Sequence, residues 1–265
     1  MVTGANQHEI AVGNMKSGHK TAAASISVLV PAHNEAGSLP GLIDEIGAAL
    51  DGERFECVVI DDGSDDTTRA TVREMMSRDW LRLIVHEVNC GKSAALRTGL
   101  MAASGDIIVM IDADGENDPA DIPQLVSILR AGPASLGMVN GRRNNRKHSP
   151  VKLLASRMAN GIRRWVLSDN TRDSGCGFKI IRAAVFHRLP YFANWHRFFP
   201  ALVQQEGFEV IESPVSDRAR MAGASHYGIL DRGFAGLIDL PAVYWLKRRS
   251  FEHVRSREQT RDNDD

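Results

Sequence analysis

The sequence predicts an α/β protein built on a mostly parallel central sheet, and three observations support this class. Short β-branched apolar runs alternate along the chain with segments of helical spacing, as expected for repeated β–α–β units. The apolar runs are nearly continuous, which indicates strands that are covered on both faces. Polar clusters follow several of these runs, at the position where the strands of such sheets bind ligands.

Each element of the first half is bounded by turn residues. Residues 26–30 (ISVLV) end at Pro31, and the segment from Ser38 to Leu50 places its apolar residues on one helical stripe. Asp66 and Thr67 are the expected caps of the second helix. The expected strands are 26–30, 55–60, 81–86, 106–111 and 136–140, and the expected helices are 38–50, 66–78, 92–103 and 121–130.

The second half is less regular, but no change in composition marks a second independent domain. Residues 151–167 have helical spacing and are followed by a polar stretch over 168–179. A helix is expected over 196–205 and a strand over 208–215. We expect residues 1–25 to be a flexible tail and residues 250–265 to be a charged, disordered tail.

Composition excludes several classes of protein. The 265 residues are 43% hydrophobic and 25% charged, and the net charge of −1 leaves no basic excess for binding nucleic acid. The three cysteines, Cys57, Cys90 and Cys176, are too widely spaced for a structural zinc site or a disulfide framework. They fit a reducing compartment, and the polar N-terminal residues lack the pattern of a signal peptide. We therefore expect a cytoplasmic protein.

The segment 229–249 has two interpretations. It has fewer than the roughly 20 consecutive apolar residues that a helix needs to span a bilayer. It is either a core helix or an amphipathic helix at the membrane interface. The second interpretation is favoured by Tyr244, Trp245 and the Lys247-Arg248-Arg249 cluster, which suit an anionic lipid surface.

The carboxylates after the run DIIVMI are the central functional feature. Asp112 and Asp114 are separated by Ala113, and Glu116 follows two residues later. Such a D-x-D pattern alone is most often a solvated turn, but its position at the end of an expected strand favours a metal site. Carboxylate oxygens are the ligands that Mg²⁺ and Mn²⁺ prefer, and such a metal would neutralise a departing diphosphate.

Two further strand ends carry polar residues. Asp62 is placed to accept hydrogen bonds from a base or a ribose, although an ordinary Asp-Gly turn explains the segment equally well. After Pro31, Asn34 is expected to cap the next helix, whereas nothing local explains His33. Gly91-Lys92 opens a helix but lacks the spacing of a phosphate-binding loop, which argues against a kinase or an ATPase.

Five blocks occur in an order that resembles the family 2 glycosyltransferases. They are PAHNEAGSL, VVIDDGSDDTT, GKSAALRTGL, ASGDIIVMIDADGENDP and DSGCGFK. The strongest resemblance is to the polyprenyl-phosphate glycosyltransferases, the group of dolichol-phosphate mannose synthase, and it extends from about residue 26 to residue 249. It implies a GT-A fold over 26–228, a UDP- or GDP-sugar donor, and Mg²⁺ or Mn²⁺ as cofactor.

The resemblance also implies roles for single residues. The positions that match donor-binding residues are Pro31, His33, Glu35, Ile60, Asp62, Asp112, Ala113, Arg143 and Lys179. The metal ligands would be Asp112, Asp114 and Glu116, where Glu116 replaces the usual glutamine. Arg142 is adjacent to Arg143, so the register of the donor-facing arginine is left open.

The expected catalytic residues are Asp114, Asp173 and Arg220. In relatives that glycosylate hydroxyls, an aspartate near Asp173 acts as the base, whereas an ionised phosphate acceptor needs no strong base. The block RARMAGASHYG resembles the acceptor loop of the family. Its acceptor-binding residues would be Arg218, Arg220, Ser225 and His226, with His226 in place of the usual lysine.

The resemblance thus implies a metal-dependent, inverting glycosyltransferase that moves a sugar from a nucleoside-diphosphate sugar to a polyprenyl phosphate. We expect it to lie peripherally on the inner face of the cytoplasmic membrane. One alternative is a family 2 enzyme that acts on a soluble saccharide or protein hydroxyl, with Asp173 as its base. Another is a non-catalytic protein that binds nucleotide sugars, which the intact Asp112 and Asp114 disfavour.

Overall fold

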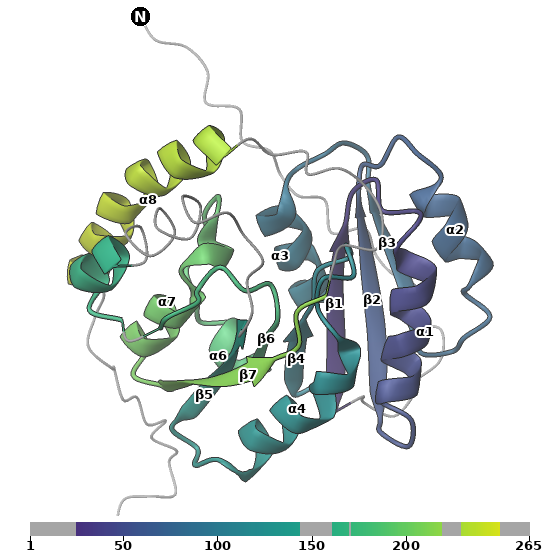
Figure 1. Ribbon diagram of the computed structural model, residues 1–265, viewed down its shortest axis with the longest axis horizontal. Helices are drawn as coiled ribbons and strands as arrows, with labels where there is room; N and C mark the ends of the chain where they lie inside the picture. The colour runs from purple at the N-terminus through teal and green to yellow at the C-terminus, as the bar shows by residue number, and fades with distance from the viewer. Residues whose placement is uncertain (1–24, 144–160, 170, 219–228, 250–265) are drawn as a thin grey trace, which may run out of the picture.

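A computed structural model describes residues 25–143, 161–169, 171–218 and 229–249 (Figure 1). Its centre is a seven-stranded sheet with the order β3-β2-β1-β4-β6-β5-β7. The strands are β1 (Ile26–Ala32), β2 (Phe55–Asp62), β3 (Leu81–His86), β4 (Ile107–Met110), β5 (Leu136–Arg143), β6 (Lys179–Arg182) and β7 (Glu209–Val215). The predicted α/β class is confirmed.

The sheet is mostly parallel, as the sequence predicted, because β1 pairs in parallel with β2 and β4, β2 with β3, and β5 with β7. The exception is β6, which runs antiparallel between β4 and β5. The strand β6 was not predicted, since its four residues are too few to show a periodicity and follow a polar stretch.

The described helices are α1 (Leu39–Ala49), α2 (Thr68–Glu74), α3 (Lys92–Ala102), α4 (Ile122–Ala131), α6 (Ala183–Phe186), α7 (Phe199–Gln205) and α8 (Ile229–Arg249). Short 3-10 turns, η1 (Pro119–Asp121) and η2 (Trp195–Arg197), precede α4 and α7. Residues 161–167 are also helical. The expected helix over 151–167 therefore lies partly outside the described residues.

Two apolar cores lie on opposite faces of the sheet. One contains the buried stripes of α1 and α4 against the apolar side chains of β1 and β4. The other contains α3, α6 and α7 together with Val243 of α8. Alternate residues of β1 divide between the cores, with Val28 in the first and Leu29 in the second, which explains why the apolar runs are continuous.

Three local predictions need correction. The helix expected up to Arg78 ends at Glu74. The helix expected over 196–205 is divided into η2 and α7, since Pro200 suits only the first turn of a new helix. Asn34 does not cap α1, because α1 begins at Leu39 and Asn34 has a φ of 59° and accepts a hydrogen bond from the Asp65 N–H.

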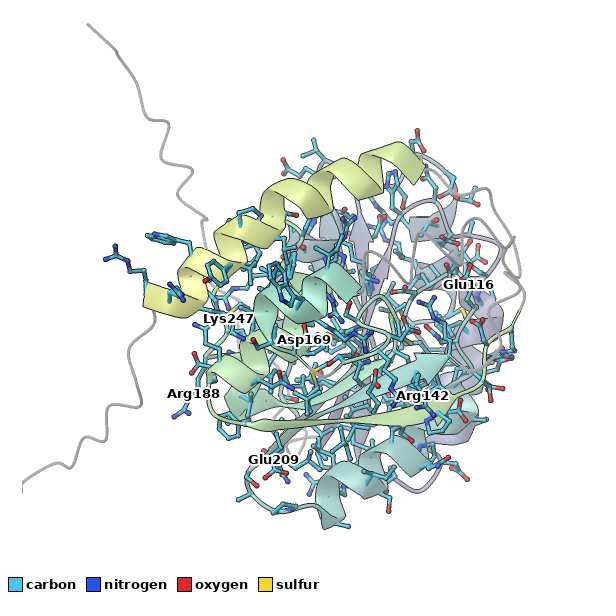
Figure 2. All side chains as sticks on the ribbon, turned by 60° about the vertical axis from the view of Figure 1, so that its left-hand side comes forward. Glu116, Arg142, Asp169, Arg188, Glu209 and Lys247 are labelled. Atoms are coloured by element: carbon cyan, nitrogen blue, oxygen red, sulfur yellow. The ribbon has the colours of Figure 1, made fainter. Side chains whose placement is uncertain are left out.

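The helix α8 lies on the opposite side of the molecule from α1 and α2 (Figure 1). It packs against the helical residues 161–167, where Lys247 Nζ donates to the carbonyl oxygen of Leu167 (2.5 Å). Lys247 also lies near Asp169 of the segment that follows (Figure 2). Among the described residues, no helix is long and apolar enough to cross a bilayer.

Candidate active site

The candidate site gathers residues from the carboxyl-terminal end of the parallel strands. Asp62 ends β2, and Asp112 follows β4. Lys92 begins α3, and the loop before β6 brings Asp173 and Gly177 to the same edge. The sheet order places β1, β2 and β4 side by side, so their polar ends form one rim.

Asp112 is held between a cation and a glycine. Lys92 Nζ forms an ion pair with Asp112 Oδ1, and both side chains are about one-third exposed (33% and 31%). A Cβ placed on Gly177 would lie 2.2 Å from Asp112 Oδ2, so the carboxylate rests directly on the glycine backbone. Burial opposes ionisation of Asp112, but the charge of Lys92 outweighs it and lowers the pKa of the carboxyl group.

Two further basic groups lie near this pair, the buried Lys179 and the half-buried His196. Lys179 is 4% exposed, and its Nζ donates to the carbonyl oxygens of Ser174 and Cys176, which fixes the loop that contains Gly177. Burial lowers the pKa of Lys179 to about 8. Burial also lowers the pKa of His196 well below its usual value, with a further contribution from the charge of Lys92. His196 is therefore neutral at pH 7.

The predicted metal ligands have suitable chemistry but are not yet assembled around one point. Asp112 faces Lys92, while Asp114 Oδ1 accepts a hydrogen bond from the Glu116 N–H (3.1 Å) across the turn at Gly115. All three side chains present hard carboxylate oxygens, which fit Mg²⁺ or Mn²⁺. Within the described parts of the chain, the one group of three His, Cys, Asp or Glu side chains whose ligand atoms lie within 4.8 Å of each other is elsewhere.

That other group comprises Asp62, His86 and Cys90, and its geometry is that of a hydrogen-bonded hub. Asp62 Oδ1 lies 2.7 Å from His86 Nδ1 and accepts from the Cys90 N–H (2.9 Å). Its Oδ2 accepts from the Gly91 N–H (2.7 Å). The carboxylate thus ties the loop before α3 to β2. The predicted role of Asp62 at a base or ribose stays a prediction.

Hydrogen bonds hold the loop after β1 against the segment that follows β2. His33 Nδ1 donates to the carbonyl oxygen of Asp62 (3.0 Å), which also fixes its tautomer. The Glu35 N–H donates to Thr68 Oγ1 (2.8 Å). Pro31 lies beside Ile60 in the sheet register, and the side chain of Ile60 is fully buried under Gly99. Ile60 and the buried Ala113 therefore support the site through the backbone and the core.

Asp173 is engaged in a two-point ion pair. Arg143 Nε and Nη2 donate to Asp173 Oδ2 and Oδ1, both at 3.0 Å, and the Arg143 N–H adds a third contact. Both side chains are largely buried. Burial opposes the charge of Arg143, but Asp173 outweighs it and raises the pKa of the guanidinium. The arginine that pairs with Asp173 is Arg143, and its expected place facing the donor stays a prediction.

Arg218, which was expected to bind the acceptor, forms an ion pair with Glu45, and its acceptor role stays a prediction. Its Nη1 and Nη2 donate to the two carboxylate oxygens of Glu45 on α1, at 3.1 and 2.8 Å. Its Nη2 also lies 3.3 Å from Asp118. These contacts indicate that Arg218 anchors the chain to α1. Arg220, Ser225 and His226 lie outside the described residues, as do residues 1–24 of the tail expected over 1–25 and the whole tail expected over 250–265.

Sequence reasoning missed several residues of this site. Lys92 was considered only as part of a phosphate-binding loop, and Gly177, His86 and His196 were not considered. The signal for Lys92 was its position directly after the Gly91 turn, at the start of the helix that precedes β4. The signal for Gly177 was its place inside the DSGCGFK block.

The fold and the site define the class of protein. Known structures with this fold include glucosyl-3-phosphoglycerate synthase from Mycobacterium tuberculosis in complex with Mn²⁺, UDP-glucose and phosphoglyceric acid. That chain is 23% identical, with a TM-score of 0.64, over 84% of this chain and 79% of that one. A complex of the same synthase with Mg²⁺ and UDP has a TM-score of 0.64 at 24% identity, over 84% of this chain and 79% of that one. The fold is therefore GT-A, as expected.

Residues 27–189 match the family described as Glycosyl transferase family 2, and the chain belongs to that family. It is 33% identical to a dodecaprenyl-phosphate galacturonate synthase of Rhizobium johnstonii, over 84% of this chain and 67% of the relative. It is 31% identical to an undecaprenyl-phosphate 4-deoxy-4-formamido-L-arabinose transferase of Edwardsiella ictaluri, over 77% of this chain and 63% of the relative. The chain thus spans about two thirds of the length of these relatives.

Proposed function

We propose that this glycosyltransferase moves a sugar from a UDP- or GDP-sugar to a polyprenyl phosphate, with inversion at the anomeric carbon. An oxygen of the acceptor phosphate attacks that carbon, and the bond from the carbon to the donor diphosphate breaks. The names of the two relatives support an acceptor of this chemical class.

The observation that carries the proposal is the pair between Arg143 and Asp173. Both oxygens of the carboxylate accept from the guanidinium, and a carboxylate held by a cation is a weaker base. A hydroxyl acceptor needs a base, whereas a phosphate is largely ionised at pH 7. The pair therefore favours a phosphate acceptor over the saccharide or protein hydroxyl of the alternative reading.

The donor would bind along the rim formed by the ends of β1, β2 and β4. Asp112, Asp114 and Glu116 would hold Mg²⁺ or Mn²⁺ there, and the bound ion would neutralise the charge on the leaving diphosphate. The chain itself orients these groups through Gly177, which seats Asp112, and through the Glu116 N–H, which fixes Asp114. The carbonyl-bound Lys179 holds the loop beneath them.

A peripheral membrane contact on the inner face of the cytoplasmic membrane completes the proposal. Trp165 and Trp245 are 84% and 60% exposed on the two helices that pack together. Arg248 and Arg249 lie over the rings of Tyr244 and Trp245, with 5.0 and 6.0 Å between the guanidinium carbon and the ring centroid. Exposed aromatic rings beside cations suit the headgroup region of an anionic bilayer.

This surface is joined to the active site through buried contacts. Arg163 lies on the inner face of the helical residues 161–167, where its Nη1 is 3.1 Å from Asp169 Oδ2. Its Nη2 donates to the carbonyl oxygen of Thr171 (2.6 Å), two residues before Asp173. A bilayer that binds the outer face of this helix would therefore lie on the element that supports the Asp173 loop.

The decisive experiment offers the enzyme two acceptors that differ in one group. Purified protein receives labelled UDP- or GDP-sugars with Mn²⁺ or Mg²⁺, and either a polyprenyl phosphate or the corresponding polyprenol. We expect label in the phosphate lipid alone, and none after EDTA until the metal is restored. Equal transfer to the polyprenol, or to a soluble saccharide in preference to lipid, would refute the phosphate acceptor.

The membrane contact has a separate test. Binding to liposomes with anionic headgroups should be stronger than binding to neutral liposomes, and should weaken at high salt. Replacing Trp165 and Trp245 by Ser should lower the bound fraction while transfer to a short, detergent-dispersed acceptor persists. Equal binding of wild type and variant would remove this surface from the proposal.

A further inference from the structure

The ion pair between Lys92 and Asp112 carries an inference beyond the family assignment. Lys92 is the first residue of α3 and follows the turn at Gly91, whose φ is 87°. Its ammonium contacts Oδ1 of Asp112, the first carboxylate of the D-x-D segment. Thus a carboxylate that we expect to bind the metal or the donor already has a protein cation as its partner.

The two lysines at this place differ in their freedom to move. Lys179 is buried, and its Nζ is held by two backbone carbonyl oxygens. Lys92 has a flexible side chain that is 33% exposed. Asp112 is confined on one side, since Gly177 lies directly behind its carboxylate. If the pair opens, Lys92 is the partner that leaves.

We propose that Lys92 is a positioning residue that holds Asp112 while the donor is absent and transfers to the donor diphosphate when the donor binds. This inference rests on the proposed metal-dependent use of a nucleoside-diphosphate sugar. In the donor-free protein, the ammonium and a divalent cation compete for the Asp112 carboxylate. A diphosphate removes this competition, because it supplies new anionic oxygens to the ammonium.

The exchange couples the two ligands. Metal alone must displace Lys92 and leave an ammonium without its anion, so it binds weakly. Metal that arrives with the diphosphate lets each cation keep an anionic partner, because Lys92 moves onto phosphate oxygens. By linkage, the nucleotide then raises metal affinity by the same factor as the metal raises nucleotide affinity. We assign part of this mutual increase in affinity to the movement of Lys92 from Asp112 to the diphosphate.

The test measures Mn²⁺ binding directly, by electron paramagnetic resonance of the free ion or by calorimetry, without and with UDP or GDP. Lys92→Met should bind Mn²⁺ about two- to fivefold more tightly than wild type without nucleotide, the range expected from removing a partly exposed ion pair. The nucleotide should strengthen Mn²⁺ binding less in Lys92→Met than in wild type. Lys92→Arg keeps the charge and should bind Mn²⁺ alone as wild type does.

The matched control is Arg73→Met, which removes one positive charge from the exposed surface of α2. It should leave both affinities unchanged. If Lys92→Met binds Mn²⁺ no more tightly than wild type, or no more tightly than Arg73→Met does, the inference is wrong while the proposed function stands. If wild type binds no Mn²⁺ even with nucleotide, the metal-dependent function fails and the inference falls with it.

Discussion

The substitution Gly177→Ala tests the geometry of the site more sharply than removal of a ligand. The new Cβ would lie 2.2 Å from Asp112 Oδ2, 2.4 Å from Cγ and 2.7 Å from Oδ1, whereas ordinary contacts begin at 3.4 Å. The carboxylate must therefore move by about 1 Å, a misplacement that can lower a rate about a hundredfold. Asp112 itself remains in the protein and keeps its charge.

The fold should survive this change. The clash involves the end of a short side chain that is 31% exposed, so the carboxylate can rotate away without moving the sheet. We expect the free energy of unfolding to fall by about 1 kcal/mol, the low end for overpacking. Activity and stability should thus separate, with a large loss of sugar transfer in a protein that remains folded.

The assay measures the initial rate of transfer to a polyprenyl phosphate at saturating Mn²⁺, the Mn²⁺ affinity with UDP or GDP, and the urea midpoint. Gly161→Ala is the matched control, because a Cβ there meets nothing within 4 Å. It should leave the rate and the Mn²⁺ affinity near wild type, while the urea midpoint should not fall, since alanine favours the helix more than glycine does. If Gly177→Ala transfers sugar within about threefold of the wild-type rate, the seat of Asp112 on Gly177 is irrelevant to function and the reasoning is refuted.

Two further predictions concern the buried charges. Asp173→Asn should lower the free energy of unfolding by about 3 kcal/mol, because it leaves the Arg143 guanidinium buried and unpaired. Adding Arg143→Gln should then cost little more, and additive losses in a urea double-mutant cycle would contradict the pair. For Lys179, with a pKa of about 8, nucleotide affinity should fall as the pH rises above 8, since the ammonium is lost. Stability should rise between pH 8 and the pKa of the unfolded side chain, since the unfolded chain there binds more protons. Calorimetry and urea unfolding from pH 7 to 10 should show neither slope in Lys179→Met.

The fold was predictable because most of its strands have a recognisable local sequence pattern. Runs such as ISVLV contain β-branched residues and end at a turn residue, so their existence follows from the sequence. The strand β6 does not behave in this way, since KIIR is only four residues long and its direction depends on its neighbours β4 and β5. A short strand between two others is stabilised by the sheet rather than by its own pattern.

The carboxylates of the candidate site were predictable from the sequence, but the cations that form ion pairs with them were not. Asp112 and Asp114 were found because they follow an apolar strand. Their partners depend on how distant segments meet: Lys92 lies 20 residues before Asp112, and Arg143 lies 30 residues before Asp173. No local pattern fixes which cation faces which carboxylate, so Asp173 was expected among the catalytic residues without its partner Arg143, which contacts both of its oxygens.

These pairs have a consequence for how the donor and the metal enter. Asp112 is balanced by Lys92, and Asp173 is balanced by Arg143, so each carboxylate already has a cation of its own. A divalent cation alone would add positive charge beside ammonium and guanidinium groups, and a diphosphate alone would add negative charge beside carboxylates. The charges of a divalent cation and a nucleoside-diphosphate sugar largely cancel. A pre-paired site of this kind therefore favours their joint binding over either ligand alone, because only the joint complex lets each cation keep an anionic partner.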